Sequence, residues 1–196
     1  MGDDLASRVE HALRASDAVR DVQHVGSRAR GNATALSDWD FRISVTDFPT
    51  VAAELPELVR PLSPLGEQWD RLSEEQCYMV LLHGPHKVDL IFDEPHVDEP
   101  PWRVTPETLQ PIDAHFWDWI LWLASKREKG QDEVVRRELA KMSVHLLRPL
   151  GVDRVPGSIE SALESYRSAR DEREREFGVE VSRRLEHEVL HALSER

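Results

Sequence analysis

The chain has 196 residues, of which 40% are hydrophobic and 32% charged. This length and composition suit one ordinary domain, or a small domain with a helical extension, and they exclude fibrous and intrinsically disordered proteins. The formal net charge of −12 opposes contact with a phosphate backbone over a large surface, which argues against an extended nucleic acid partner.

The amino terminus and the cysteine content limit the cellular compartment. Cys77 is the only cysteine, which rules out an intramolecular disulfide and a cysteine-based zinc site within one chain. Acidic residues follow Met1 where a signal peptide has basic ones, and no stretch reaches the roughly 18 apolar residues of a membrane helix. We therefore expect a cytoplasmic protein with no membrane partner.

The first half of the sequence predicts alternating helices and strands. Apolar residues with helical spacing predict a helix over residues 3–16, and β-branched residues favour a strand that ends at Gly26. Residues 41–45 alternate between apolar and polar side chains, as a half-buried strand does. Two apolar runs, residues 76–82 and 87–92, flank a Gly-Pro turn and predict an antiparallel hairpin.

One further helix and two irregular segments complete this part of the chain. Asp47 is a suitable N-cap for a helix that runs toward Pro56, and we expect this proline to break or kink it. Residues 61–75 are expected to form a loop. Prolines and acids crowd the segment from Asp93 to Pro111, which resists regular structure and separates two domains.

The second half of the sequence is helical in pattern throughout. Periodic apolar residues predict helices over about 113–129 and 132–148, the second of which ends at Pro149. Ser158 can cap a third helix, and a last helix is expected through Val181 and the residues after it. This half is predicted to be a separate helical domain.

Aromatic side chains on the first of these helices have two interpretations. They can stack on a flat ligand or pack in the core, and we favour the core, with Trp119 as the member expected to be exposed. The cluster comprises Phe116, Trp117, Trp119 and Trp122.

Candidate catalytic acids follow a glycine-serine turn. Asp38 and Asp40 stand two residues apart at the predicted start of a strand, so their carboxylates project to the same side and can hold a hard cation. Asp89, on the second arm of the hairpin, adds a third carboxylate. Three converging acids repel one another unless divalent cations neutralise them, and two such ions can align a nucleophile and a leaving group. An Asp-x-Asp pair taken alone is more often a turn or a cap.

The turn itself has features of a phosphate-binding loop. Gly26 lets the backbone approach a phosphate closely, and the hydroxyl of Ser27 can donate a hydrogen bond to its oxygens. Arg28 and Arg30 either contact phosphates or are solvated arginines on a loop, and Lys87 leaves the same two readings open.

This arrangement resembles the signature of the DNA polymerase beta-like nucleotidyltransferase superfamily. Residues 25–27 (Val-Gly-Ser) are followed by ten intervening residues and then by residues 38–41 (Asp-Trp-Asp-Phe), while residues 88–90 (Val-Asp-Leu) resemble the third family element. The run of residues 26–31 (Gly-Ser-Arg-Ala-Arg-Gly) is especially similar to aminoglycoside nucleotidyltransferases and to the minimal nucleotidyltransferases of toxin-antitoxin pairs. The resemblance covers residues 5–95, and the later helices match no part of the family pattern.

The resemblance implies a fold, a reaction and a set of cofactors. It implies an α+β fold, with a small mixed sheet and flanking helices in a nucleotidyltransferase domain over residues 1–98, and it leaves residues 112–196 as a helical substrate-binding domain. ATP would be the donor and Mg²⁺, as two ions, the cofactor, with Asp38 and Asp40 as metal ligands. Asp89 would be either a third ligand or the base that deprotonates the acceptor hydroxyl. The acidic charge favours a small cationic acceptor such as an aminoglycoside.

Three other functions are weighed against this one. An antitoxin of the same chemistry would modify a partner protein, although such antitoxins often lack a long helical extension. A catalytically inactive nucleotide-binding protein is disfavoured because all three acids are present. Residues 187–191 (His-Glu-Val-Leu-His) fit the zinc protease motif His-Glu-x-x-His, but the chain continues only to Arg196 and offers no downstream third ligand.

Overall fold

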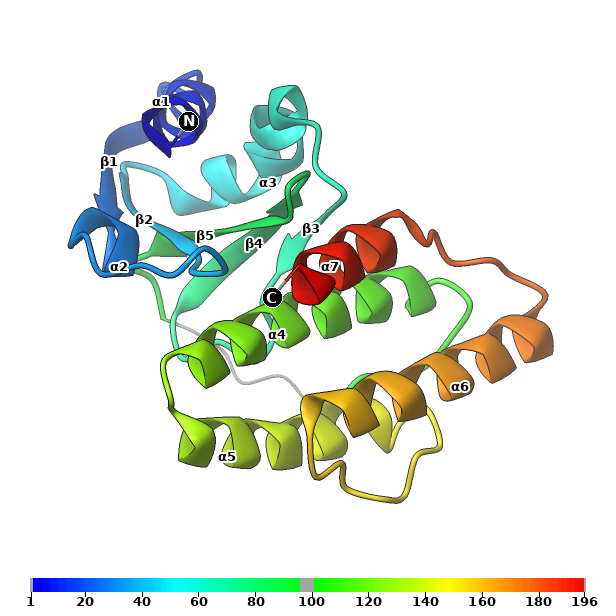
Figure 1. Cartoon of the computed structure of the whole chain (residues 1–196). Coiled ribbons are helices and arrows are strands. Elements are labelled where there is room, and N and C mark those ends of the chain that lie inside the picture. Colours follow the sequence, from blue (N-terminus) through cyan, green and yellow to red (C-terminus); the bar gives the residue numbers. More distant parts are fainter. Residues whose placement is uncertain (1, 96–100, 196) are drawn as a thin grey trace. The chain divides into compact units, whose positions relative to one another are not determined.

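The computed structural model describes residues 2–95 and 101–195. Contacts divide this part of the chain into two units, formed by residues 2–33 with 37–95 and by residues 34–36 with 101–195. The expected domain limits at residues 98 and 196 lie outside the described residues. The first unit contains a sheet with helices, and the described residues of the second form helices and loops (Figure 1).

Five strands form the sheet of the first unit, in the order β1-β2-β5-β4-β3. β2 and β5 are parallel, and the other neighbouring pairs are antiparallel. The sheet is therefore mixed, which confirms the predicted α+β fold class, and β4 and β5 form the expected hairpin. The strands are β1 (Val19–Val25), β2 (Trp39–Val45), β3 (Gly66–Trp69), β4 (Gln76–Leu82) and β5 (His86–Phe92).

One face of this sheet is covered by α1 (Gly2–Leu13) and α3 (Phe48–Val59), the second of which is capped by Asp47 as predicted (Figure 1). Phe41 and Ile43 of β2 are 1% and 0% exposed in the core that these helices share with the sheet. Because side chains alternate along a strand, Asp40 points to the opposite face. The helical layer therefore leaves the face that bears Asp40 for other contacts.

In the first unit, the expectation of a helix break at Pro56 and that of a loop throughout residues 61–75 are wrong. Pro56 does not break α3, which continues to Val59, because the buried stripe of Val51, Leu55 and Val59 outweighs the one backbone hydrogen bond that a proline removes. The segment expected to be a loop contains β3, which pairs with β4. The Gly-Glu-Gln-Trp sequence of β3 has low β-propensity, so tertiary pairing and not local preference produces this strand.

α4 (Leu109–Glu128) is the central helix of the second unit and contacts three other helices. Residues 112–121 are all buried, as expected of a helix surrounded by others. Phe116 stacks on Tyr166 at 3.7 Å between ring centroids, and Trp117 is also buried, which confirms the core interpretation for these residues, whereas Trp122 is only partly buried. Trp119 is only 6% exposed, so the prediction that it faces solvent is wrong.

The other helices follow the predicted order with different ends. Residues 143–147 form a π-helix where a continuous α-helix was expected. Ser158 caps the third helix as predicted, since its hydroxyl accepts a hydrogen bond from the backbone N–H of Ser161 at 3.2 Å. Val181 precedes the last helix and is not part of it. These helices are α5 (Asp132–Met142), α6 (Ile159–Phe177) and α7 (Arg184–Ser194).

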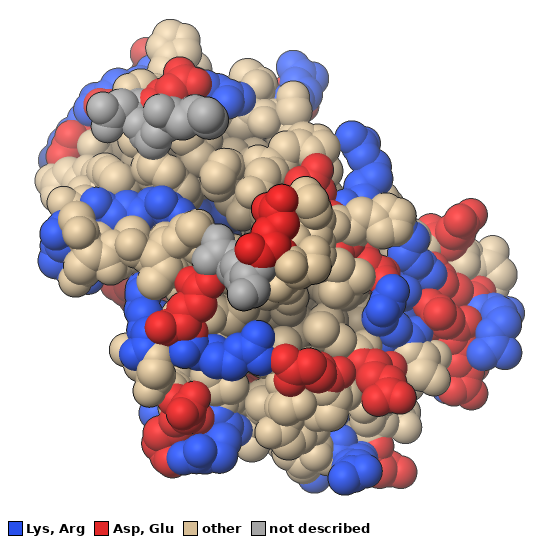
Figure 2. Space-filling model, viewed as in Figure 1, with Lys and Arg blue, Asp and Glu red and all other residues tan. Residues whose placement is uncertain are grey.

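A buried ion network joins α4, α6 and α7. Asp113 of α4 is fully buried and accepts hydrogen bonds from the Tyr166 hydroxyl at 2.7 Å and from Arg170 at 3.3 Å. Arg170 of α6 also donates to Glu186 of α7 at 2.5 Å. Figure 2 shows that acidic and basic side chains also interleave on the outer surface of α6.

None of the described helices combines the length and the apolar composition needed to cross a membrane.

Candidate active site

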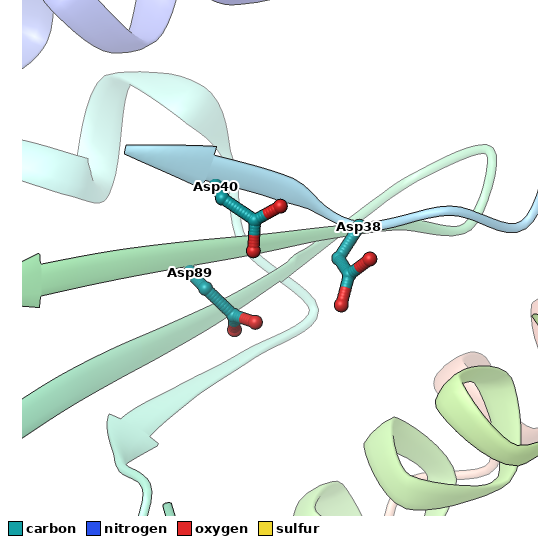
Figure 3. Close-up of side chains that lie close together, drawn as sticks. All are labelled: Asp38, Asp40 and Asp89. Carbon is teal, nitrogen blue, oxygen red and sulfur yellow. The ribbon is translucent and has the colours of Figure 1, made fainter. Parts of the chain in front are cut away.

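Three aspartates converge on one face of the sheet of the first unit. Asp40 of β2 lies directly opposite Asp89 of β5 in the parallel pair, so both side chains leave the sheet on the same side. Asp38 precedes β2 by one residue and points toward them (Figure 3). One carboxylate oxygen from each of the three side chains lies within 4.8 Å of the others. The expected convergence of these acids is therefore present.

Gly26 makes this arrangement sterically feasible. The residue has a φ of +73°, and a Cβ atom built on it would lie 1.7 Å from Oδ2 of Asp40. Register explains the contact, because Val25, the neighbour of Gly26, pairs with Asp40 across β1 and β2. A glycine is thus required at position 26 because the Asp40 carboxylate approaches its backbone closely. From the sequence alone, we instead expected this glycine to allow the approach of a phosphate.

The short helix α2 (Gly26–Ala29) carries the other candidate binding residues. The hydroxyl oxygen of Ser27 is buried and has no hydrogen-bond partner among the described residues. Arg28 donates to the backbone carbonyl of Ser37 at 2.8 Å, and its guanidinium carbon lies 4.4 Å from the centre of the Trp39 ring. Arg30 is exposed, and Figure 2 shows basic side chains over this segment.

The contacts of Arg28 hold it beside the acids. Burial lowers the pKa of its guanidinium, whereas the charges of Asp38 and Asp40 raise it. Because Arg28 reaches back to Ser37, it also connects α2 to the residue that immediately precedes Asp38. This side chain is therefore held against the residues around the start of β2 and is not a solvated loop arginine.

A lysine is buried at the third carboxylate. Lys87 and Asp89 are two residues apart on β5, and they are 6% and 9% exposed. The Lys87 ammonium donates a short hydrogen bond to Oδ1 of Asp89. Burial raises the pKa of Asp89, Lys87 opposes that shift, and the negative charges of Asp38 and Asp70 add to it. The Asp89 carboxylate is thus paired with the Lys87 ammonium and is also repelled by the charges of two other acids.

Asp70 is an acid near the site that the sequence did not indicate. It follows β3 directly, and its carboxylate accepts hydrogen bonds from the backbone N–H groups of Leu72 at 2.9 Å and Ser73 at 3.1 Å. Since the strand before it was expected to be a loop, nothing in the local pattern predicted that the charge of Asp70 would act on Asp89. The contact of Lys87 with Asp89 could have been predicted, because residues two apart on a strand have side chains on the same face.

The donor set fits a hard divalent cation. All the oxygens come from carboxylates, which are the ligands that Mg²⁺ prefers in proteins. Within the described residues, Asp38, Asp40 and Asp89 are the one group of three His, Cys, Asp or Glu side chains close enough to share an ion. Burial is the main cause that raises the pKa of Asp89, and the negative charges of Asp38 and Asp70 add to it, a repulsion that a bound cation would relieve.

The competing zinc motif lies elsewhere, on α7. His187 and His191 are both exposed, and Nε2 of His191 lies 3.5 Å from Oε1 of Glu195. In the part of the chain that the structure describes, no third ligand completes a site around these two histidines.

Six solved protein chains match this chain in structure, among them the two that follow. An aminoglycoside 6-adenyltransferase from Bacillus subtilis aligns over 97% of this chain and 96% of its own, with a TM-score of 0.33 and 11% identity. The polymerase core of TRAMP, an RNA surveillance complex, aligns over 81% of this chain and 46% of its own, with a TM-score of 0.36 and 10% identity. No protein-family profile and no curated protein sequence matches the chain.

Proposed function

We propose that the protein is a Mg²⁺-dependent nucleotidyltransferase that moves AMP from ATP to a hydroxyl group of a small cationic acceptor. The observation that carries this proposal is the convergence of Asp38, Asp40 and Asp89 beside the glycine-serine turn. Carboxylates grouped in this way serve phosphoryl and nucleotidyl transfer, in which divalent cations neutralise the charge of the phosphates.

Asp38 and Asp40 are the residues that would hold magnesium. Their carboxylates lie at one end of β2. Gly26 has no Cβ atom and so leaves room for the side chain of Asp40. A magnesium ion bound there would polarise the α-phosphate and neutralise developing negative charge. The buried Ser27 hydroxyl, which lacks a partner among the described residues, is available to donate to a phosphate oxygen.

The transfer forms one bond and breaks one. The oxygen of the acceptor hydroxyl attacks the α-phosphorus, the bond between this phosphorus and the bridging oxygen to the β-phosphate breaks, and pyrophosphate leaves. The hydroxyl proton goes to Asp89, whose raised pKa makes it a better proton acceptor than an ordinary aspartate. One oxygen of Asp89 is engaged by Lys87, so the second oxygen is the one to receive the proton.

The overall charge supports a cationic acceptor. A net charge of −12 attracts small polycations and repels polyanions, and an aminoglycoside combines several ammonium groups with several hydroxyl groups. ATP, which is itself anionic, would depend on the bound cation and on basic groups such as Arg28 for its attraction to the site.

The direct test is pyrophosphate release from ATP and Mg²⁺ across a panel of aminoglycosides and related amino sugars. Asp40→Asn should reduce the rate at least about 10³-fold while leaving the fold intact, because it removes a metal ligand. Asp17→Asn is the matched control, since Asp17 is exposed in the turn between α1 and β1, and it should retain the wild-type rate.

Acceptor-dependent release that vanishes in Asp40→Asn would establish the reaction and the acceptor class. Release in that variant at a rate near wild type would contradict the proposed site. If no amino sugar supports release, but AMP becomes attached to a co-purifying protein, the acceptor is a protein and that part of the proposal is wrong.

A further inference from the structure

The buried Lys87 is not explained by the proposed reaction alone. Lysine is seldom buried unless it is paired, and Lys87 is 6% exposed on the face of β5 that carries Asp89. Its ammonium group contacts one oxygen of Asp89, the carboxylate that lies opposite Asp40. A positive charge is therefore built into the group of acids where divalent cations are expected.

The charges around the site balance in a particular way. Asp38, Asp40, Asp70 and Asp89 bring four negative charges, and the charges of Asp38 and Asp70 both act on Asp89. Lys87 and Arg28 bring two positive charges, the second of which acts on Asp38 and Asp40. Two negative charges remain, and one divalent cation balances them. A second cation, in the absence of nucleotide, would make the site positive.

We propose that Lys87 takes the place of a second metal ion at Asp89, so that the nucleotide-free protein binds a single divalent cation through Asp38 and Asp40. Lys87 is a positioning residue in this scheme, because it acts through Asp89: its ammonium group holds Oδ1 of that carboxylate and leaves the other oxygen to act as the base. The inference rests on the proposed function only in that it assumes a cation at Asp38 and Asp40.

The test counts Mn²⁺ ions bound to the full chain without nucleotide, by electron paramagnetic resonance of the free ion. The wild type should bind one ion per chain. Lys87→Gln should bind Mn²⁺ about tenfold more tightly, because a nearby positive charge is removed and Asp89 is released to the metal. Lys129→Gln, at the end of α4 in the second unit, is the matched control and should leave binding unchanged.

A double variant separates this role from ordinary metal ligation. In Lys87→Gln combined with Asp89→Asn, both charges of the pair disappear, so one ion should still bind with an affinity within about threefold of wild type. A neutral pair of similar volume is also expected to fold even if Lys87→Gln alone does not, because no buried charge is left uncompensated. Near-ultraviolet circular dichroism checks the fold of each variant.

The outcomes are distinct. Two ions bound to the wild type, unchanged affinity in Lys87→Gln, or a loss of tenfold or more in the double variant would each overturn the role of Lys87 while leaving the nucleotidyltransferase proposal standing. Absence of Mn²⁺ binding to the wild type, or full binding to Asp40→Asn, would instead remove the metal site on which the proposed function depends.

Discussion

At the scale of single residues, Gly26 is the position where the site depends most on one missing side chain. Gly26→Ala would place its Cβ atom 1.7 Å from Oδ2 of Asp40 on a backbone with φ of +73°. We expect a loss of at least about 10²-fold in nucleotidyl transfer and of about 1 to 3 kcal/mol in the free energy of unfolding, because Asp40 must move away. Pyrophosphate release and urea denaturation measure the two effects.

Gly31→Ala is the control for backbone strain alone. Gly31 has a similar φ of +70°, but a Cβ atom there would meet no atom within 4 Å. This variant should lose about 1 kcal/mol of stability and keep its activity. Equal losses of activity in the two variants would show that strain, and not the displacement of Asp40, is responsible.

The residues of the site differ in how far their sequence context predicted them. Asp38, Asp40 and Asp89 were found because an Asp-x-Asp pair and a later strand acid form a recognisable pattern, and the structure brings them together. The close contact of Gly26 with Asp40 depends on the register between β1 and β2, which no local pattern specifies. Asp70 was missed for the same reason, since its electrostatic effect on Asp89 depends on the pairing of β3 with β4.

At the scale of secondary-structure elements, Arg170 is the main link among three helices of the second unit. Its side chain is 2% exposed and contacts Asp113 of α4 and Glu186 of α7. Arg170→Met should lower the free energy of unfolding by about 3 to 5 kcal/mol, because the buried Asp113 loses the cation that it pairs with and Glu186 keeps only Arg167 and Arg183. Urea denaturation of the full chain measures the loss.

An exposed ion pair in the same unit provides the comparison. Arg127 of α4 contacts Glu160 of α6 at 2.6 Å, with side chains that are 46% and 67% exposed. Arg127→Met should cost less than about 1 kcal/mol, because solvent screens this pair. A comparable loss in both variants would mean that burial is not what gives the Arg170 network its strength.

The connection between α6 and α7 should be sensitive to acid. Glu174 accepts hydrogen bonds from the backbone N–H of Val181 at 2.6 Å and from Arg183 at 2.9 Å. Burial raises the pKa of Glu174, but these hydrogen bonds outweigh it and bring the pKa below the ordinary value of 4.5. A depressed pKa stabilises the folded state above the unfolded value, and this contribution is lost as the pH falls through the folded pKa.

Unfolding of Glu174→Gln as a function of pH tests that connection. The variant should be less stable than the wild type at neutral pH, and the difference should shrink once the pH falls below about 4.5, where the wild-type carboxyl gains its proton. A difference that stays constant from pH 7 to pH 3 would show that the ionised carboxylate is not the stabilising species.

Elements with strong apolar periodicity were predicted well, and those formed by tertiary contacts were not. The β4–β5 hairpin and the cap at Ser158 have local sequence signals, and both are present. Pro56 is tolerated inside α3 because one face of that helix is buried, which a local rule for proline does not include. Trp119 was misplaced since α4 is enclosed on most sides and has no solvent face at that position.

At the scale of the whole molecule, the net charge of −12 should act in opposite directions on the two proposed substrates. Added salt screens both attraction and repulsion over distances of roughly 10 Å. We expect KM for a cationic acceptor to rise severalfold between about 0.05 and 0.5 M NaCl, while KM for ATP stays constant or falls. Steady-state kinetics at fixed Mg²⁺ measures both, and a KM for the acceptor that does not change with salt would contradict a role for the global charge.

The parallel pairing of β2 with β5 also has a consequence for the order in which the protein is made. Asp38 and Asp40 leave the ribosome well before Asp89, and β5 can align with β2 only after α3, β3 and β4 have been synthesised between them. Contacts between residues so far apart in the chain form late in folding. The proposed cation site is therefore assembled only when the first unit of a nascent chain is nearly complete, so a Mg²⁺ or Mn²⁺ ion would bind a sheet that is already formed and would not guide the early steps of folding.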